Sequence, residues 1–238
     1  MAFARGRNMM LLEDILENNK EEIDNIIPLD FNKEKLFVFD FTKTNRDLEK
    51  IDMNSAQDFY RYIKETLRSN NSKIGIGKYN EDRIIYRHSP LFGTNDGELR
   101  TVHIGVDIFL PVGTKIYAPL DAQLHSFQNN KGIGDYGPTI ILQHKIDGVV
   151  FYTLYGHLSE ESLAGKFKGQ IIKKGENIGE IGKVKVNGNW PEHVHFQIIS
   201  DMMGKKGDFP GIATIREREI YIKLCPNPNL ILKIKKLI

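Results

Sequence analysis

The feature that most constrains this chain is a change of texture at about residue 83. From there on, short runs rich in Val, Ile, Phe and Tyr alternate with Gly, Pro, Asn and Asp. Short apolar runs separated by turn residues are typical of antiparallel strands joined by tight connections. The runs cover residues 84–87, 106–109, 115–117, 139–143, 149–155, 170–173 and 194–199. The sequence therefore predicts a mainly β protein (α+β overall) with an antiparallel β-sandwich or barrel-like core.

The residues on either side of this region are predicted to be mixed. Helical spacing of apolar residues predicts a helix over 9–26, stopped by Pro28, and a second helix from Asn54 or Ser55 to Leu67. Residues 36–41 read as a strand, 215–224 as a last helix, and the final residues as an edge strand with lysines on its solvated face. We therefore predict a mixed α/β N-terminal extension (1–85), a core (86–205), and a C-terminal helix and strand that pack on the core (206–238).

Bulk composition excludes some classes of protein. The chain has 238 residues and a net charge of +2, which gives no argument for a nucleic-acid or membrane partner. No apolar run reaches the ~18 residues that span a bilayer. Cys225 is the single cysteine, so we expect a buried structural thiol and no internal disulfide. The N-terminus does not read as a signal peptide, which predicts a cytoplasmic location. The oligomeric state is not predicted.

Three of the histidine-containing motifs stand out. In the first, His103 and Asp107 are four residues apart, and Gly105 between them lets the backbone bend without a side chain in the way. Imidazole and carboxylate are both ordinary zinc ligands, although this spacing alone is common.

The second motif places His193 and His195 on a strand-like segment, where residues two apart share a face. The third places His157 at the end of the strand 149–155, a position where catalytic groups often face a groove. Each has an ordinary alternative, a solvent-facing strand or an exposed histidine. Together, however, the three motifs offer two imidazole ligands, one carboxylate and two further histidines. Three protein ligands with an open fourth position are typical of a catalytic zinc site.

The amino-acid sequences of these motifs resemble those of the lysostaphin-like (LytM-type) zinc metalloendopeptidases of bacterial cell walls. The resemblance runs from about residue 100 to 199 and rests on HIGVD (103–107), YGHL (155–158), KKGENIGEIG (173–182) and HVHFQI (193–198). It implies one zinc per chain held by His103, Asp107 and His195, with His193 and His157 as catalytic residues. It also implies a peptide or peptidoglycan-like substrate. The chain further resembles peptidase-like domains of larger proteins that also carry aminotransferase and kinase-like domains. This second resemblance rests on the segments DYGPTIILQH, FYTLYGHLS and NPNLIL.

The hypothesis is therefore a zinc-dependent hydrolase of amide or peptide bonds, with His193 as general base and His157 as oxyanion stabiliser, or the reverse. One alternative is a latent or non-catalytic regulatory domain in which residues 1–95 supply a fourth ligand; another is a hydrolase of an intracellular amide. A third is a lipoyl-like carrier, which would need a modified Lys173 or Lys174 at a hairpin tip.

Other candidates near the motifs have simpler readings. Tyr155 and Trp190 could line a groove or pack the core, and Tyr136 reads as part of a hairpin turn. His125 and His144 are expected to be structural, and nothing requires His88 at the site.

Overall fold

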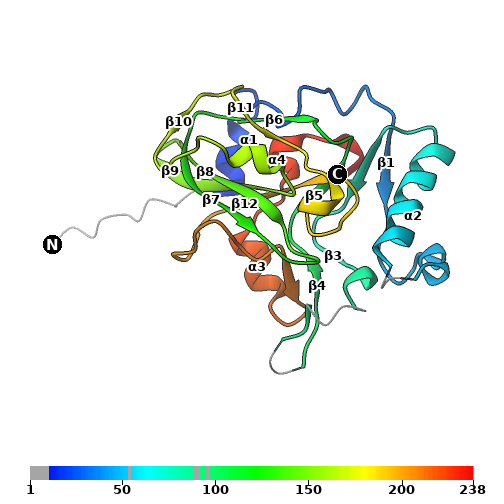
Figure 1. Cartoon of the computed structure of the whole chain (residues 1–238). Coiled ribbons are helices and arrows are strands. Elements are labelled where there is room, and N and C mark those ends of the chain that lie inside the picture. The colour runs from blue at the N-terminus through cyan, green and yellow to red at the C-terminus, as the bar shows by residue number, and fades with distance from the viewer. Residues whose placement is uncertain (1–10, 53–54, 88–91, 95–96, 238) are drawn as a thin grey trace.

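The computed structural model describes residues 11–52, 55–87, 92–94 and 97–237. Its centre is an eight-stranded sheet in the order β1-β2-β5-β12-β9-β8-β7-β10 (Figure 1). In that order the strands are β1 (Leu36–Phe39), β2 (Ile74–Gly77), β5 (Val106–Phe109), β12 (His193–Ile199), β9 (Val149–Gly156), β8 (Gly137–Ile146), β7 (Ala122–Asn130) and β10 (Ile171–Ile172). β1 and β2 run parallel, and the other neighbours run antiparallel. The predicted mainly β, antiparallel-rich fold is confirmed.

Two smaller sheets flank the large one. The first pairs β11 (Asn177–Glu180) with β6 (Lys115–Tyr117). The second has the order β13 (Ile212–Thr214), β4 (Arg100–His103) and β3 (Glu81–Asp82). Since β4 lies between β13 and β3, the histidine at its end has neighbours from both the early and the late part of the chain.

The helices cover the edges of this β structure. They are α1 (Leu12–Asn18), α2 (Ala56–Ser69), α3 (Arg218–Leu224) and α4 (Asn229–Leu232), with short 3-10 helices η1 (Arg46–Lys50), η2 (Ile84–Tyr86), η4 (Glu160–Leu163), η5 (Val184–Val186) and η6 (Lys235–Leu237). α2 begins after Ser55, whose side chain accepts a hydrogen bond from the Asp58 amide. The other candidate cap, Asn54, lies outside the described residues. In the part of the chain that the structure describes, no helix has the length and apolar character needed to cross a membrane.

The predicted N-terminal extension joins the sheet of the predicted core. β2 pairs with β5 through Gly75–Phe109 and Gly77–Asp107, and α2 packs beside β1 at the right of Figure 1. Aromatic residues fill the space between them: Phe39, Phe41, Phe59 and Phe109 belong to one buried cluster. The position of β5 inside the sheet therefore depends on residues before 85.

The two ends of the described chain pack together. α1 and α4 lie side by side in Figure 1, and the Asn25 side chain donates to the Leu232 carbonyl at 3.2 Å. Lys233 Nζ donates to the Ile23 carbonyl at 2.7 Å. These contacts close the large apolar core, to which both ends contribute.

Three local predictions are wrong. The first helix ends at Asn18 instead of residue 26, because Asn19 caps its last turn by donating to the Ile15 carbonyl at 2.9 Å; Met9 lies outside the described residues. Residues 84–87 form a 3-10 turn instead of a strand. The final strand is replaced by α4 and η6, since Lys233 adopts a left-handed conformation (φ 55°) that interrupts extended backbone.

Other element ends shift by a few residues. The predicted helix 215–224 begins at Arg218, and the strand at 170–173 shortens to β10. The strand predicted over 36–41 ends at Phe39. Strands β2, β3, β4, β7, β11 and β13 were not predicted. The two lysines that a lipoyl-like carrier would modify are both in ion pairs. Lys173 pairs with Asp121, and Lys174 pairs with Asp24.

Candidate metal centre

The register of three neighbouring strands brings distant motif residues together. Asp107 on β5 lies opposite His195 on β12, and His195 lies opposite Gly156 on β9. His157 follows directly after Gly156, and His193 comes two residues before His195 on the same strand. Residues two apart on a strand share a face, so one face of the sheet carries the acid and the imidazoles.

His103 reaches the same point from a different sheet. It ends β4, and the chain turns through Ile104 and Gly105 into β5. His103 and Asp107 therefore lie on two different strands, and Gly105 between them has the role expected of it. A Cβ at Gly105 would lie 2.4 Å from Cε1 and 2.5 Å from Nε2 of His195, so only glycine leaves room for that ring.

Three donor atoms converge in a small triangle. His103 Nε2 lies 3.0 Å from His195 Nδ1, Asp107 Oδ1 lies 3.2 Å from His103 Nε2, and Asp107 Oδ1 lies 3.1 Å from His195 Nδ1. Tetrahedral zinc with bonds of about 2.0–2.1 Å would place its ligand atoms about 3.3 Å apart. Among the described residues, these three form the group able to hold a metal, and all three are buried. Their donor types, two nitrogens and a carboxylate oxygen, fit zinc.

Hydrogen bonds fix which ring nitrogen faces the triangle. His103 Nδ1 donates to the Lys78 carbonyl at 2.9 Å, which leaves Nε2 free as a donor atom for a metal. His195 Nε2 lies 3.1 Å from Gln197 Oε1, which leaves Nδ1 free. Gln197 is itself oriented, because its amide nitrogen donates to the Pro210 carbonyl at 3.1 Å. Both rings are thus held in the tautomer that metal binding needs.

The charge states also suit a cation. Burial, and then the neighbouring Arg83 charge, lower the pKa of His103 to about 4, so its imidazole is neutral at neutral pH. Burial by itself would raise the pKa of Asp107, but the neighbouring Arg83 charge helps to hold it well below its ordinary value. A neutral imidazole and an ionised carboxylate are the forms that coordinate zinc.

The two remaining histidines lie beside the triangle and against each other. The ring centroids of His157 and His193 are 4.1 Å apart. His157 Nδ1 donates to the Asn187 carbonyl at 2.9 Å, and His193 Nδ1 donates to the Pro191 carbonyl at 2.7 Å. Burial lowers the pKa of both rings, and proximity to His193 lowers that of His157 further. Both rings are therefore neutral, and each Nε2 is free to accept a proton.

His157 faces the site because its backbone breaks the strand alternation. Its φ of 63° is left-handed, which is uncommon for a residue other than glycine. Tyr155, two residues earlier, lies fully buried in the apolar core, which is one of the two roles predicted for it. The left-handed residue thus separates the strand's core-facing tyrosine from its site-facing histidine.

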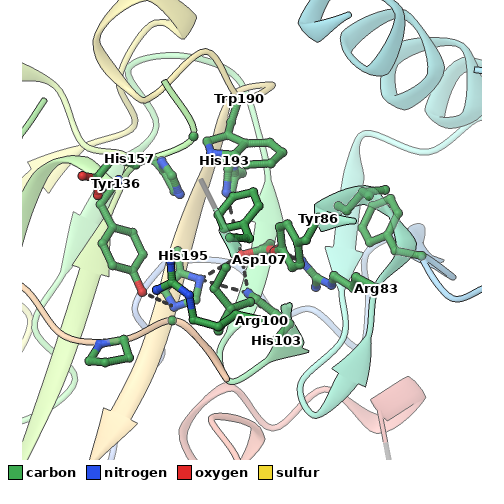
Figure 2. Close-up of a pocket in the computed structure, with 18 of the residues that line it drawn as sticks. Arg83, Tyr86, Arg100, His103, Asp107, Tyr136, His157, Trp190, His193 and His195 are labelled. Carbon is green, nitrogen blue, oxygen red and sulfur yellow. Dashed lines mark hydrogen bonds and ion pairs between the residues drawn. The ribbon is translucent and has the colours of Figure 1, made fainter. Parts of the chain in front are cut away.

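These residues line one wall of a cavity of about 380 Å³. Figure 2 shows Tyr136 on one side of His195, with Arg83 and Tyr86 on the other side, behind Asp107. The cavity is also lined by Phe41, Phe59, Ile85, Phe92, Arg100, Gly134, Asp135, Trp190, Lys205 and Asp208. Trp190 therefore lines the cavity, which is one of the two roles predicted for it.

Two lining residues that contact the triangle were missed from the sequence. The Tyr136 hydroxyl lies 3.4 Å from His195 Nε2, although Tyr136 read as a turn residue; its position next to the Gly137 turn was the available signal. Arg83 contacts Asp107, and no motif pointed to it. His144 is buried, and His125 lies on β7 away from the cavity-lining residues. His88 lies outside the described residues.

Comparison with known proteins shows which family part of the chain matches. Residues 101–207 match the family described as Peptidase family M23. The match contains every motif that carried the resemblance, and the lysostaphin-like prediction is confirmed.

The M23 domain has relatives of known name. Peptidoglycan DD-endopeptidase ShyA of Vibrio cholerae is 28% identical over 122 residues, which is 50% of this chain and 26% of ShyA. The chain thus spans about a quarter of the length of that relative. The lysostaphin catalytic domain from Staphylococcus simulans is 25% identical, with a TM-score of 0.38, over 64% of this chain and 93% of that one. A zinc-containing peptidase from Vibrio cholerae is 24% identical, with a TM-score of 0.33, over 46% and 31%.

Proposed function

We propose that the protein is a zinc-dependent hydrolase of amide or peptide bonds. The observation that carries the proposal is the buried triangle of His103, Asp107 and His195, whose donor atoms lie 3.0 to 3.2 Å apart. Backbone and side-chain acceptors already hold both rings in the coordinating tautomer. This arrangement of buried polar side chains is not what core packing alone favours, because burying polar groups costs free energy that a core of aliphatic residues avoids.

Zinc bound there would supply a Lewis acid that polarises a carbonyl and acidifies water. The chain's own residues then move the proton. His193 is the proposed general base, because its Nε2 is unprotonated and lies 3.7 Å from Asp107 Oδ1. The carboxylate stabilises the imidazolium that forms when His193 takes the proton of water. His193 can return that proton to the leaving amine.

His157 is the proposed partner for the developing oxyanion. Its Nδ1 is committed to the Asn187 carbonyl, so a hydrogen bond from Nε2 requires a second proton on the ring. Burial and the two neighbouring imidazoles oppose that charge. A negative oxygen beside the ring offsets this opposition, so the cationic form is favoured when it is needed.

The proposed substrate is a peptide, with peptidoglycan as its main candidate. The support is the M23 match together with ShyA, a relative named as a peptidoglycan DD-endopeptidase. The latent alternative finds no support among the described residues, where the group able to hold a metal gains no fourth ligand from the N-terminal extension.

The metal is tested first. Elemental analysis of the purified chain should find about one zinc per molecule, and His195→Ala should lose it. His193→Ala should keep zinc and lose hydrolysis, whereas the matched control His125→Ala should keep both. Retention of zinc by His195→Ala would contradict the ligand set.

The substrate is tested separately. Purified peptidoglycan and a small peptide library are incubated with the zinc-loaded chain, and the products are read by mass spectrometry. Cleavage that is absent with His193→Ala supports the proposal. Inactivity of the zinc-loaded protein on all of these substrates would overturn the peptidase reading while leaving the metal site intact.

A further inference from the structure

A guanidinium group lies buried directly behind the carboxylate of the metal triangle. Arg83 is 1% exposed and comes from the short segment between β3 and η2, outside the residues that match the M23 family. It donates to Asp107 Oδ2 at 2.6 Å, to Glu81 Oε2 at 3.0 Å, to the Tyr86 hydroxyl at 3.0 Å and to the Lys78 carbonyl at 3.0 Å. An arginine is rarely this buried, and four hydrogen bonds fix its orientation.

This contact divides the two oxygens of Asp107 between two tasks. Oδ2 accepts from Arg83, whereas Oδ1 faces His103 Nε2 and His195 Nδ1 at 3.2 and 3.1 Å. Rotation of the carboxylate would break the bond to Arg83. Arg83 therefore holds Asp107 in the orientation that offers one oxygen to a metal.

Glu81 balances the charge that this arrangement introduces. An unpaired cation behind Asp107 would neutralise the carboxylate and repel a divalent ion. Glu81 is buried, binds Arg83 through Oε2, and binds Lys78 Nζ through Oε1 at 3.0 Å. Two carboxylates thus flank one guanidinium, so Arg83 does not face Asp107 as an unpaired cation.

The same segment also orients a second ligand. The Lys78 carbonyl accepts both from Arg83 Nη2 and from His103 Nδ1. Gly77, one residue earlier, leaves the space, since a Cβ there would lie 2.8 Å from Arg83 Nη2 and 3.1 Å from Asp107 Oδ2. Residues 77–86 therefore brace two of the three ligands from behind.

We propose that Arg83, charge-balanced by Glu81, is a positioning residue for the metal ligand Asp107, so that the N-terminal extension completes the metal centre of the M23 domain. This inference rests on the proposed zinc site. Partners behind the ligands of a metal site affect affinity because they fix ligand orientation, and their loss weakens binding by ~10–100-fold.

The test measures zinc affinity of the full chain by competition with a chromophoric chelator. Arg83→Met should weaken zinc binding by ~10–100-fold. Arg83→Lys should weaken it similarly, because the positive charge remains but the planar fork is lost. Glu81→Gln should weaken it too, since the Arg83 charge then goes unbalanced. The matched control is Arg87→Met, an arginine four residues later that pairs with Asp82 near the surface.

Two further readings separate positioning from general damage. Far-UV circular dichroism must show that each variant is folded, and if Arg83→Met does not fold, Arg83→Lys and Glu81→Gln decide the question. Cobalt substituted for zinc should give an altered visible spectrum in the Arg83 variants and an unaltered one in Arg87→Met.

The outcomes are distinct. A charge effect alone predicts tighter zinc binding in Arg83→Met, because a cation has been removed. Unchanged or tighter binding by folded Arg83 variants would overturn this inference, while loss of zinc by His195→Ala still supports the metal site. A wild-type chain that binds no zinc would overturn the proposed function itself.

Discussion

Gly105 offers the sharpest test of the site geometry, because one methyl group should displace a metal ligand. The Cβ of Gly105→Ala would lie 2.4 Å from Cε1 of His195, 2.5 Å from its Nε2 and 2.9 Å from the Phe196 carbonyl oxygen. Carbon atoms in contact prefer about 3.5 Å, so the ring must retreat by about 1 Å. His195 cannot retreat freely, because Nε2 is held by Gln197 and the ring lies on a central strand.

The magnitude follows from that displacement. Overpacking of this size costs about 1–3 kcal/mol of stability. Misplacement by about 1 Å lowers catalytic rate by about 10²-fold, and zinc affinity should fall by at least about tenfold. We expect Gly105→Ala to fold, to melt a few degrees lower, and to lose most of its zinc at micromolar concentration.

Zinc affinity, thermal unfolding and turnover would be measured on the same preparations. The matched control is Gly132→Ala, whose added Cβ has its nearest neighbour at an ordinary 3.4 Å. If Gly105→Ala bound zinc and turned over substrate within threefold of wild type, the reasoning that places His195 against this glycine would be refuted.

Three further predictions concern the support of the site and of the fold. Gln197→Leu removes the acceptor of His195 Nε2, so zinc affinity should fall by ~10–100-fold in chelator competition; no change would mean that the tautomer needs no such partner. Burial lowers the pKa of His144 to about 4 from 6.5, so its contribution to stability is complete above about pH 6.5 and is lost as pH falls towards 4. About 3 kcal/mol should be lost over that range, and urea unfolding of His144→Gln should show a correspondingly weaker pH dependence. A chain of residues 86–238 lacks β1 and β2, which pair beside β5. We expect it to lack a cooperative unfolding transition by circular dichroism, and a sharp transition would show that the core folds alone.

The sequence predicted the site better than it predicted the elements around it. His103, Asp107, His157, His193 and His195 all line one cavity. The convergence of Asp107, His157, His193 and His195 follows from the pairing of β5, β12 and β9, and each of those strands has a clear apolar signature. His103 comes from β4, which was not predicted. Strand spacing placed His193 and His195 on one face, whereas the assignment of ligands came from the resemblance of the motifs to a known family.

Arg83 shows where sequence reasoning stops. It follows two acidic residues, Glu81 and Asp82, and no motif included it, yet Arg83 and Glu81 are both buried. Burial of such a pair depends on contacts with Asp107 and Tyr86, and no local pattern encodes them. The N-terminal boundary at residue 85 stays a prediction, although β1 and β2 join the sheet that carries Asp107.

The C-terminal residues show a different failure. Leu232 and Ile234 are both buried and alternate with lysines, as in an edge strand. The left-handed Lys233 between them produces the same alternation without extended backbone. Burial was therefore predicted correctly and conformation was not, because a period of two describes which side chains are covered and not how the chain turns between them.

The left-handed backbone of His157 has a consequence for how this protein would respond to selection. A non-glycine residue in that region costs of order 1 kcal/mol, and Asn or Gly would relieve the cost. Under the proposed mechanism, only the imidazole serves catalysis at this position. Thermal stability and catalytic turnover therefore favour different residues at position 157. A screen for melting temperature would favour Asn or Gly there, and a screen for hydrolysis would retain His.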